Sequence, residues 1–181
     1  MTGLDDDLLA RSLRELGDRL DGTQIEPLGA RLATVVSAVV DLLGVESIGL
    51  LLLDDTDRIR SVASTGPAAR VLELAHEKVV VGPGVDALNG EMMAVTDLAA
   101  EPRYAVLWRE VAGHGVRAVL AAPIRLGDLV VGNLNAVLPE PHAWTPGERR
   151  SAAAFAGIVG QLLGLAARES VSVTDRNGRS G

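Results

Sequence analysis

The chain has 181 residues, of which 48% are hydrophobic, so it is long and apolar enough to bury the core of one domain and is not a disordered chain. Its net charge is −7 and it has no dense run of basic residues, which argues against direct nucleic-acid binding. It contains no cysteine, which excludes disulfides, thiolate metal sites and cysteine nucleophiles.

The N-terminal sequence MTGLDDDLLARS is acidic and lacks the basic and then apolar pattern of a secretion signal. No apolar run reaches the roughly 18 residues that a membrane span requires. We therefore expect a cytoplasmic protein that does not enter a membrane.

A first helix is predicted over residues 4–20, within an N-terminal segment assigned to residues 1–25. Four leucines at spacings of four, three and four form a narrow stripe on it: Leu9, Leu13, Leu16 and Leu20. A stripe this narrow suits one partner helix, which predicts a homodimer interface here.

The next segments predict a helix, an antiparallel strand pair and a second helix, at residues 26–43, 45–53, 58–64 and 67–77. The helix over 67–77 is expected to turn Val71, Leu74 and Ala75 inward. His76, close to its end, is expected at the surface.

A tight Gly-Pro-Gly turn at residues 82–84 leads into a short helix, and a short strand follows at 92–95. Residues 103–113 carry apolar side chains at the i, i+3, i+4 and i+7 spacing of an amphipathic helix. These side chains are Tyr104, Leu107, Trp108 and Val111.

Two β-branched runs, 116–124 and 129–137, are joined by Gly127-Asp128 and predict a β-hairpin. The last helix is predicted over 146–168, because Thr145 and Glu148 form a capping box around Pro146. Residues 169–181 are predicted to be a flexible tail. Paired strands with helices between them and at the ends predict an α+β fold with an antiparallel sheet.

Several short segments, in this order, resemble the GAF domain family across roughly residues 26–168. They are IGLLLLD at 48–54, GPGVDA at 82–87, VTDL at 95–98, GVRAVLAAPI at 115–124, GNLN at 132–135 and the helix cap at Thr145. The resemblance implies a central antiparallel sheet of about six strands with helices on both faces, and terminal helices that form a bundle. It also implies a pocket beneath residues 79–114.

Within this family, its motifs most resemble those of the GAF modules of actinobacterial regulators that carry an RNA-binding ANTAR domain. Gly84 stands where those modules usually have cysteine. Only a short tail follows the last predicted helix, so we expect no ANTAR part and do not carry RNA binding over. The absence of cysteine also excludes the thiol chemistry of GAF methionine sulfoxide reductases and covalent bilin attachment.

The resemblance implies that seven residues lie in or beside this pocket, and the residues alone leave structural roles open for each. Asp86 and Asp97 suit ligand contact or helix capping, and Arg117 suits an anionic ligand group or an exposed strand position. The candidates are Asp86, Asp97, Tyr104, Trp108, His114, Arg117 and Val119.

We therefore expect a sensory or regulatory module in signal transduction or transcriptional regulation, with no enzymatic activity. It is expected to bind an unidentified small molecule, to form a homodimer, or both, and to contact a signalling protein. No catalytic residues, metal ligands or obligatory cofactor are expected. One alternative is a non-covalent haem sensor that uses His114. A second alternative is a cyclic-nucleotide-binding module, although Asp86 beside the Gly-Pro-Gly turn would repel an anion.

Overall fold

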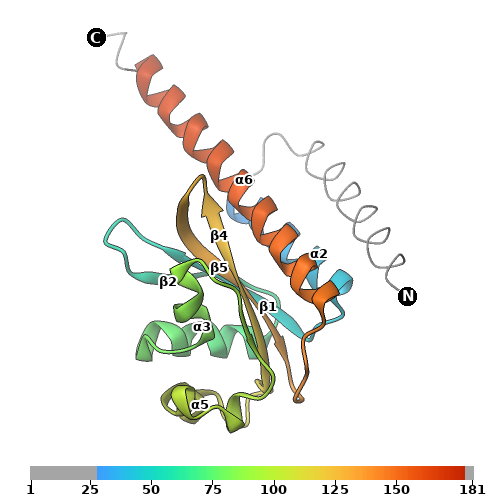
Figure 1. Cartoon of the computed structure of the whole chain (residues 1–181). Coiled ribbons are helices and arrows are strands. Elements are labelled where there is room, and N and C mark those ends of the chain that lie inside the picture. Colours follow the sequence, from blue (N-terminus) through green and yellow to red (C-terminus); the bar gives the residue numbers. More distant parts are fainter. Residues whose placement is uncertain (1–27, 178–181) are drawn as a thin grey trace.

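The computed structural model describes residues 28–177. The four leucines of the predicted dimer interface, Leu9, Leu13, Leu16 and Leu20, lie outside these residues. The described chain forms a five-stranded antiparallel sheet in the order β2-β1-β5-β4-β3, one strand fewer than expected. Helices cover both faces of the sheet, which confirms the predicted α+β class (Figure 1).

The elements follow one another nearly as predicted. The strands are β1 (Ser47–Leu53), β2 (Ile59–Ser64), β3 (Met93–Val95), β4 (Ala118–Leu126) and β5 (Leu129–Leu138). The α-helices are α2 (Leu28–Leu43), α3 (Pro67–Val79), α4 (Pro83–Asp86), α5 (Ala105–Val111) and α6 (Pro146–Asn177). Three single-turn 3-10 helices, η1 (Ala87–Asn89), η2 (Leu98–Ala100) and η3 (Pro102–Tyr104), join the elements around β3 and α5.

The strands separate two different interiors, because successive side chains point to opposite faces of a sheet. On β5, Leu134 and Ala136 belong to the apolar cluster that also contains buried residues of α2 and α6. Asn133 and Asn135 alternate with them and are completely buried on the face covered by α3 and α4. One strand thus contributes to both interiors.

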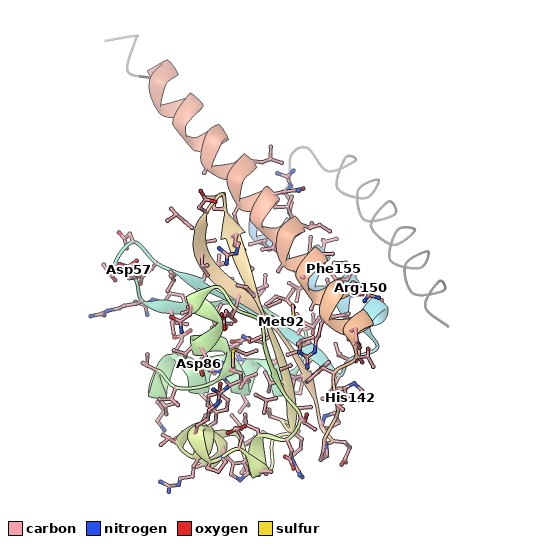
Figure 2. All side chains as sticks on the ribbon, viewed as in Figure 1. Asp57, Asp86, Met92, His142, Arg150 and Phe155 are labelled. Atoms are coloured by element: carbon pink, nitrogen blue, oxygen red, sulfur yellow. The ribbon has the colours of Figure 1, made fainter. Side chains whose placement is uncertain are left out.

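The helical layer formed by α2 and α6 is apolar where it meets the sheet. Phe155 and Val159 of α6 are fully buried, and Val35 and Val39 of α2 are buried in the same cluster. Figure 2 shows Phe155 on α6, in the layer that lies across the sheet. This layer closes one side of the sheet with aliphatic side chains and the aromatic ring of Phe155.

The inward face of α3 differs from the prediction. Leu74, expected inside, is 49% exposed, whereas Glu73 and His76 are completely buried. The expectation that His76 lies at the surface is therefore wrong. The helix is rotated toward its polar residues because Gly49 and Asn135 on the sheet leave space and hydrogen-bonding groups for them.

Helix α6 continues beyond residue 168, where the sequence predicted its end, to Asn177. Residues 169–177, which were predicted as part of a flexible tail, are helical. Between Gly164 and Asn177 the sequence has no glycine or proline that would interrupt the helix. The loss of the hydrophobic repeat after residue 168 therefore does not mark the end of this helix.

Among the described residues, Pro146–Ala167 of α6 is the one helical stretch long and apolar enough to cross a membrane by length and composition. Its buried side chains, including Ala152, Phe155 and Val159, pack in the cluster shared with the sheet and α2. About a third of the most apolar part of this stretch, 33%, is buried in the molecule.

Strand β2 lies at one edge of the sheet and is irregular. Its register with β1 shifts between Leu50 and Leu51, so that Val62 is an extra residue on the edge strand. The backbone N–H of Ser61 donates to Oε1 of Glu77 at 2.5 Å. A carboxylate from α3 therefore takes a hydrogen bond from this edge strand.

Candidate functional site

A buried polar cluster lies between the sheet and α3. It consists of Glu73 and His76 from α3 and Asn133 and Asn135 from β5, all with no exposed surface. Charged and amide side chains are rarely fully buried, because each loses its hydrogen bonds to water. Their presence together in an otherwise aliphatic interior singles out this part of the molecule.

Hydrogen bonds connect the cluster to three elements. The amide nitrogen of Asn135 donates to Oε1 and Oε2 of Glu73 at 3.0 and 3.2 Å and to Oδ1 of Asn133 at 2.7 Å. The amide nitrogen of Asn133 donates to the carbonyl of Gly84 at 2.6 Å. The Gly84 N–H donates to Nε2 of His76 at 3.3 Å, so that α3, α4 and β5 meet at one point.

Two glycines make room for this arrangement. Gly49 lies opposite Asn135 in the β1–β5 register, and a Cβ at Gly49 would overlap the carboxyl group of Glu73. A Cβ at Gly84 would lie 2.9 Å from Cε1 of His76 and 3.1 Å from the amide of Asn135. The backbone is thus shaped around the polar side chains.

The cluster is not fully satisfied. His76 Nδ1 and Asn135 Oδ1 have no hydrogen-bond partner within the described part of the chain. Because His76 Nε2 accepts from Gly84, a neutral imidazole carries its proton on Nδ1, which lies 3.6 Å from Oε2 of Glu73. The Nδ1–H group thus faces the Glu73 carboxylate beyond hydrogen-bond distance, while Asn135 Oδ1 has no donor in the described residues. A buried polar group without a hydrogen bond costs about 1–3 kcal/mol.

A solvent-accessible hollow, here called the hairpin groove, lies beside this cluster. It has a volume of about 490 Å³, within the usual range for small-molecule sites. Its lining comes from β1, the β1–β2 hairpin, the end of α3, α4 and η1: Leu53, Asp57, Arg58, Ile59, Arg60, Glu77, Val80, Val85 and Leu88. In Figure 2, Asp57 marks the tip of this hairpin.

The hairpin groove and the buried polar cluster share two elements. Glu77 of the groove follows His76 along α3, and Val85 follows Gly84 in α4. A molecule in the groove therefore contacts the same two helices that position the buried polar groups.

Val80, in the groove lining, has a strained backbone. It ends α3 in the left-handed region with φ 50° and ψ 37°, and its side chain is 59% exposed. A β-branched residue rarely adopts this conformation, which glycine adopts freely. Such strain is characteristic of ligand-binding regions, where the surrounding structure holds it in place.

Replacing Val80 with glycine is expected to stabilise the protein by about 1 kcal/mol, because it removes the left-handed strain and little buried surface. The melting temperature should rise by about 2–4 °C. Val81→Gly is the matched control. Val81 is half-buried against the apolar side chains of α3 and α5 and has no positive φ, so this substitution should lower the stability of the protein. A lower melting temperature for Val80→Gly would show that the left-handed backbone at Val80 does not destabilise the protein.

Asp86 and Tyr104, two of the predicted site residues, bind each other. The Tyr104 hydroxyl donates to Oδ2 of Asp86 at 2.6 Å, and the Arg103 guanidinium lies 4.4 Å above the Tyr104 ring. Burial, assisted by the Asp86 carboxylate, raises the pKa of Tyr104, so its hydroxyl stays a donor. This contact ties α4 to the start of α5.

Asp97 and Arg117 form a second pair. Arg117 donates from Nε and Nη2 to the two carboxylate oxygens of Asp97 at 2.8 and 2.7 Å. The hydrogen bond to Arg117 lowers the pKa of Asp97 and keeps it ionised. Trp108 lies beside the pair, with its ring 5.8 Å from the Arg117 guanidinium. The Asp97 carboxylate also caps η2 through the N–H of Ala99.

The remaining two predicted site residues lie apart from both pairs. His114 is exposed in the turn after α5, and Val119 is buried in the apolar cluster that includes Val95 and Val137. The seven predicted site residues therefore do not line one common pocket. They lie in or beside two polar pairs, in an exposed turn and in an apolar cluster. Among the described residues, neither polar contact shares a hydrogen bond with the buried polar cluster.

The four cluster residues were not predicted as site residues, although the sequence contains a signal for two of them. Asn133 and Asn135 alternate with Leu134 in a central strand, which places two amides on one buried face. Within residues 28–177, no group of three or more histidine, aspartate or glutamate side chains is arranged to hold a metal ion.

Comparison with known proteins identifies the fold. The family model described as the GAF domain matches residues 27–163. The GAF domain of a Coxiella burnetii phosphoenolpyruvate-protein phosphotransferase aligns with a TM-score of 0.72 at 16% identity, covering 92% of this chain and 96% of that one. The corresponding Acinetobacter GAF domain has a TM-score of 0.69 at 18% identity, covering 93% and 97%.

A free methionine-R-sulfoxide reductase from Neisseria meningitidis, solved with its substrate, has the same fold. It aligns with a TM-score of 0.66 at 16% identity, covering 92% of each chain. No curated protein sequence matches this chain. At these identities the solved structures establish the architecture of the chain.

Proposed function

The chain belongs to the GAF domain family, and from that premise we propose that it is a sensory or regulatory module in signal transduction or transcriptional regulation. In this proposal it binds a small molecule, has no catalytic activity and acts in the cytoplasm through a signalling protein partner. The similarity of its motifs to those of actinobacterial GAF–ANTAR regulators supports a role in transcriptional regulation.

The observation that carries the proposal is the buried polar cluster, in which two atoms, His76 Nδ1 and Asn135 Oδ1, have no hydrogen bond within the described residues. A polar network that served stability alone would satisfy its groups, because each unpaired buried atom costs free energy. A ligand that enters from the hairpin groove and supplies the missing partners would recover this cost. Its binding energy would then depend on the arrangement of α3 and α4.

Strand β5 supplies a route from ligand to output. Asn133 and Asn135 contact the polar cluster, while Leu134 and Ala136 pack in the cluster with α2 and α6. A ligand that favours one position of β5 would favour one packing of these two helices, which is a population shift between two states. The long helix α6 would carry the difference away from the sheet.

The lack of cysteine supports a non-enzymatic role. The Neisseria meningitidis relative is named as a reductase, and reduction of a sulfoxide by thiols requires cysteines that this chain does not have. The pairs Asp86–Tyr104 and Asp97–Arg117 have their polar groups bound to each other rather than aimed at a common reactive position.

Native mass spectrometry of freshly purified protein tests the proposal, because it reports bound small molecules and oligomeric state together. We expect a dimer with a small molecule bound per chain. Asn135→Ser should lose the bound mass, whereas the exposed Asn89→Ser should keep it. Leu13→Glu with Leu16→Glu should give a monomer if the leucine stripe joins two chains.

Circular dichroism of each variant separates ligand loss from unfolding. A folded wild-type chain that carries no bound mass, even after incubation with a cell metabolite extract, would refute ligand sensing. A dimer that persists in the double leucine variant would refute the assigned interface.

A further inference from the structure

We infer that the hairpin groove binds a small amphipathic anion, with an apolar body on Val85 and Leu88 and its anionic group on Arg58. This inference rests on the proposed function, because it names the ligand class of that site. It is carried by the side chains that line the groove and by the pairing of its charged groups.

The groove offers an apolar surface of suitable size. Leu53, Ile59, Val80, Val85 and Leu88 contribute most of its lining in a volume of about 490 Å³. Val80 keeps 59% of its side-chain surface accessible, and an apolar ligand gains free energy by covering such surface. A planar or aliphatic body of moderate size therefore fits the space between the hairpin and α4.

The charges in the lining differ in whether they are already engaged. Arg60 Nε is bonded to Oδ2 of Asp54 at 2.9 Å, and Oε1 of Glu77 accepts from Ser61 at 2.5 Å. The Arg58 guanidinium has no partner in the described part of the chain, and Asp57 lies in the hairpin turn. Arg58 is thus the free fork-shaped donor, which matches a carboxylate, phosphate or sulfonate.

Hydrogen bonds within the hairpin fix the backbone at Arg58. Oδ1 of Asp54 accepts from the backbone N–H of Thr56 at 2.9 Å and from that of Arg58 at 3.0 Å. The Thr56 hydroxyl also donates to this oxygen at 2.7 Å. The hydrogen bond from Thr56, with those from Arg58 and Arg60, lowers the pKa of Asp54, so the turn keeps its acceptor. Because the turn is already fixed, its backbone loses less conformational freedom when a ligand binds to Arg58.

The probe for this inference is anilinonaphthalene sulfonate, whose fluorescence rises when its aromatic body leaves water. The full chain should bind it at one saturable site. Arg58→Gln should weaken binding about 5- to 10-fold, because it removes a charge-assisted hydrogen bond. Leu88→Glu should weaken it by a similar factor or more, because it places a carboxylate in the apolar lining.

Two controls locate the effect. Arg70→Gln makes the same change in net charge at an exposed position of α3 outside the groove, and it should change affinity less than twofold. N-phenylnaphthylamine, which lacks the sulfonate, should bind wild type and Arg58→Gln equally.

The inference fails if the sulfonate probe does not bind, if Arg58→Gln or Leu88→Glu leaves its affinity unchanged, or if Arg58→Gln weakens both probes alike. None of these outcomes depends on whether the purified protein carries a natural ligand, so they are independent of the mass-spectrometric test above.

Discussion

Replacing Gly160 with alanine is expected to lower the free energy of unfolding by about 3 kcal/mol, because α6 crosses β4 there without room for a side chain. Gly160 is buried, and a Cβ on it would overlap the backbone carbonyl oxygen of Arg125. A backbone atom inside a β-ladder cannot rotate away, so the helix has to move off the sheet. The melting temperature should fall by roughly 6–12 °C.

Gly157 supplies a matched control on the same helix, one turn earlier. It is exposed, and a Cβ there would meet no atom within 4 Å. Gly157→Ala should therefore raise stability by up to about 1 kcal/mol through helix propensity alone. Thermal melts of the two variants should shift in opposite directions. Equal shifts would mean that α6 does not pack on β4 as described.

The second large effect is expected at Gly49, whose missing side chain accommodates Glu73. A Cβ at this position would overlap the Glu73 carboxyl group, which is fully buried and cannot turn to solvent. Gly49→Ala should cost about 3 kcal/mol or more, since it displaces a carboxylate from its hydrogen bonds with Asn135.

A double-mutant cycle with Glu73→Ala separates this cause from a general disturbance of β1. Glu73→Ala alone should destabilise the fold, because it leaves the Asn135 amide with one partner fewer. In that background Gly49→Ala should add little further cost, because the overlapping group is gone. Urea denaturation of the four proteins measures the coupling. Additive costs would show that the cluster does not depend on Gly49.

The element order was predictable because turns and caps are local. Gly127 with Asp128 marks the β4–β5 hairpin, and Gly127 has φ 63°, as that turn requires. Thr145 and Glu148 form the capping box expected at the start of α6, with bonds of 2.6 to 3.2 Å. The sequence places the end of α6 too early, because a helix can continue past the last hydrophobic repeat where neither glycine nor proline interrupts it.

The site was less predictable, because it depends on groups that come together from distant segments. Hydrophobicity assigned Leu74 to the interior of α3, yet Glu73 and His76 occupy it, since Gly49 and Asn135 on the sheet complement them. Asp97 and Arg117 were both suggested as ligand contacts and instead bind each other. The sequence around a single charged residue does not show whether its side chain is available to a ligand or pairs with a residue twenty positions away, as Asp97 and Arg117 do.

The two edges of the sheet are poorly suited to self-association by strand addition. Chains that expose regular edge strands can add further strands and grow into fibres. Here the bulge at Val62 and the Glu77 carboxylate interrupt β2, while β3 has three residues and the carbonyl of Val95 accepts from the Trp144 indole. Polymerisation by strand addition is therefore disfavoured at both ends. Copies that associate through helical surfaces instead can close after a defined number of chains.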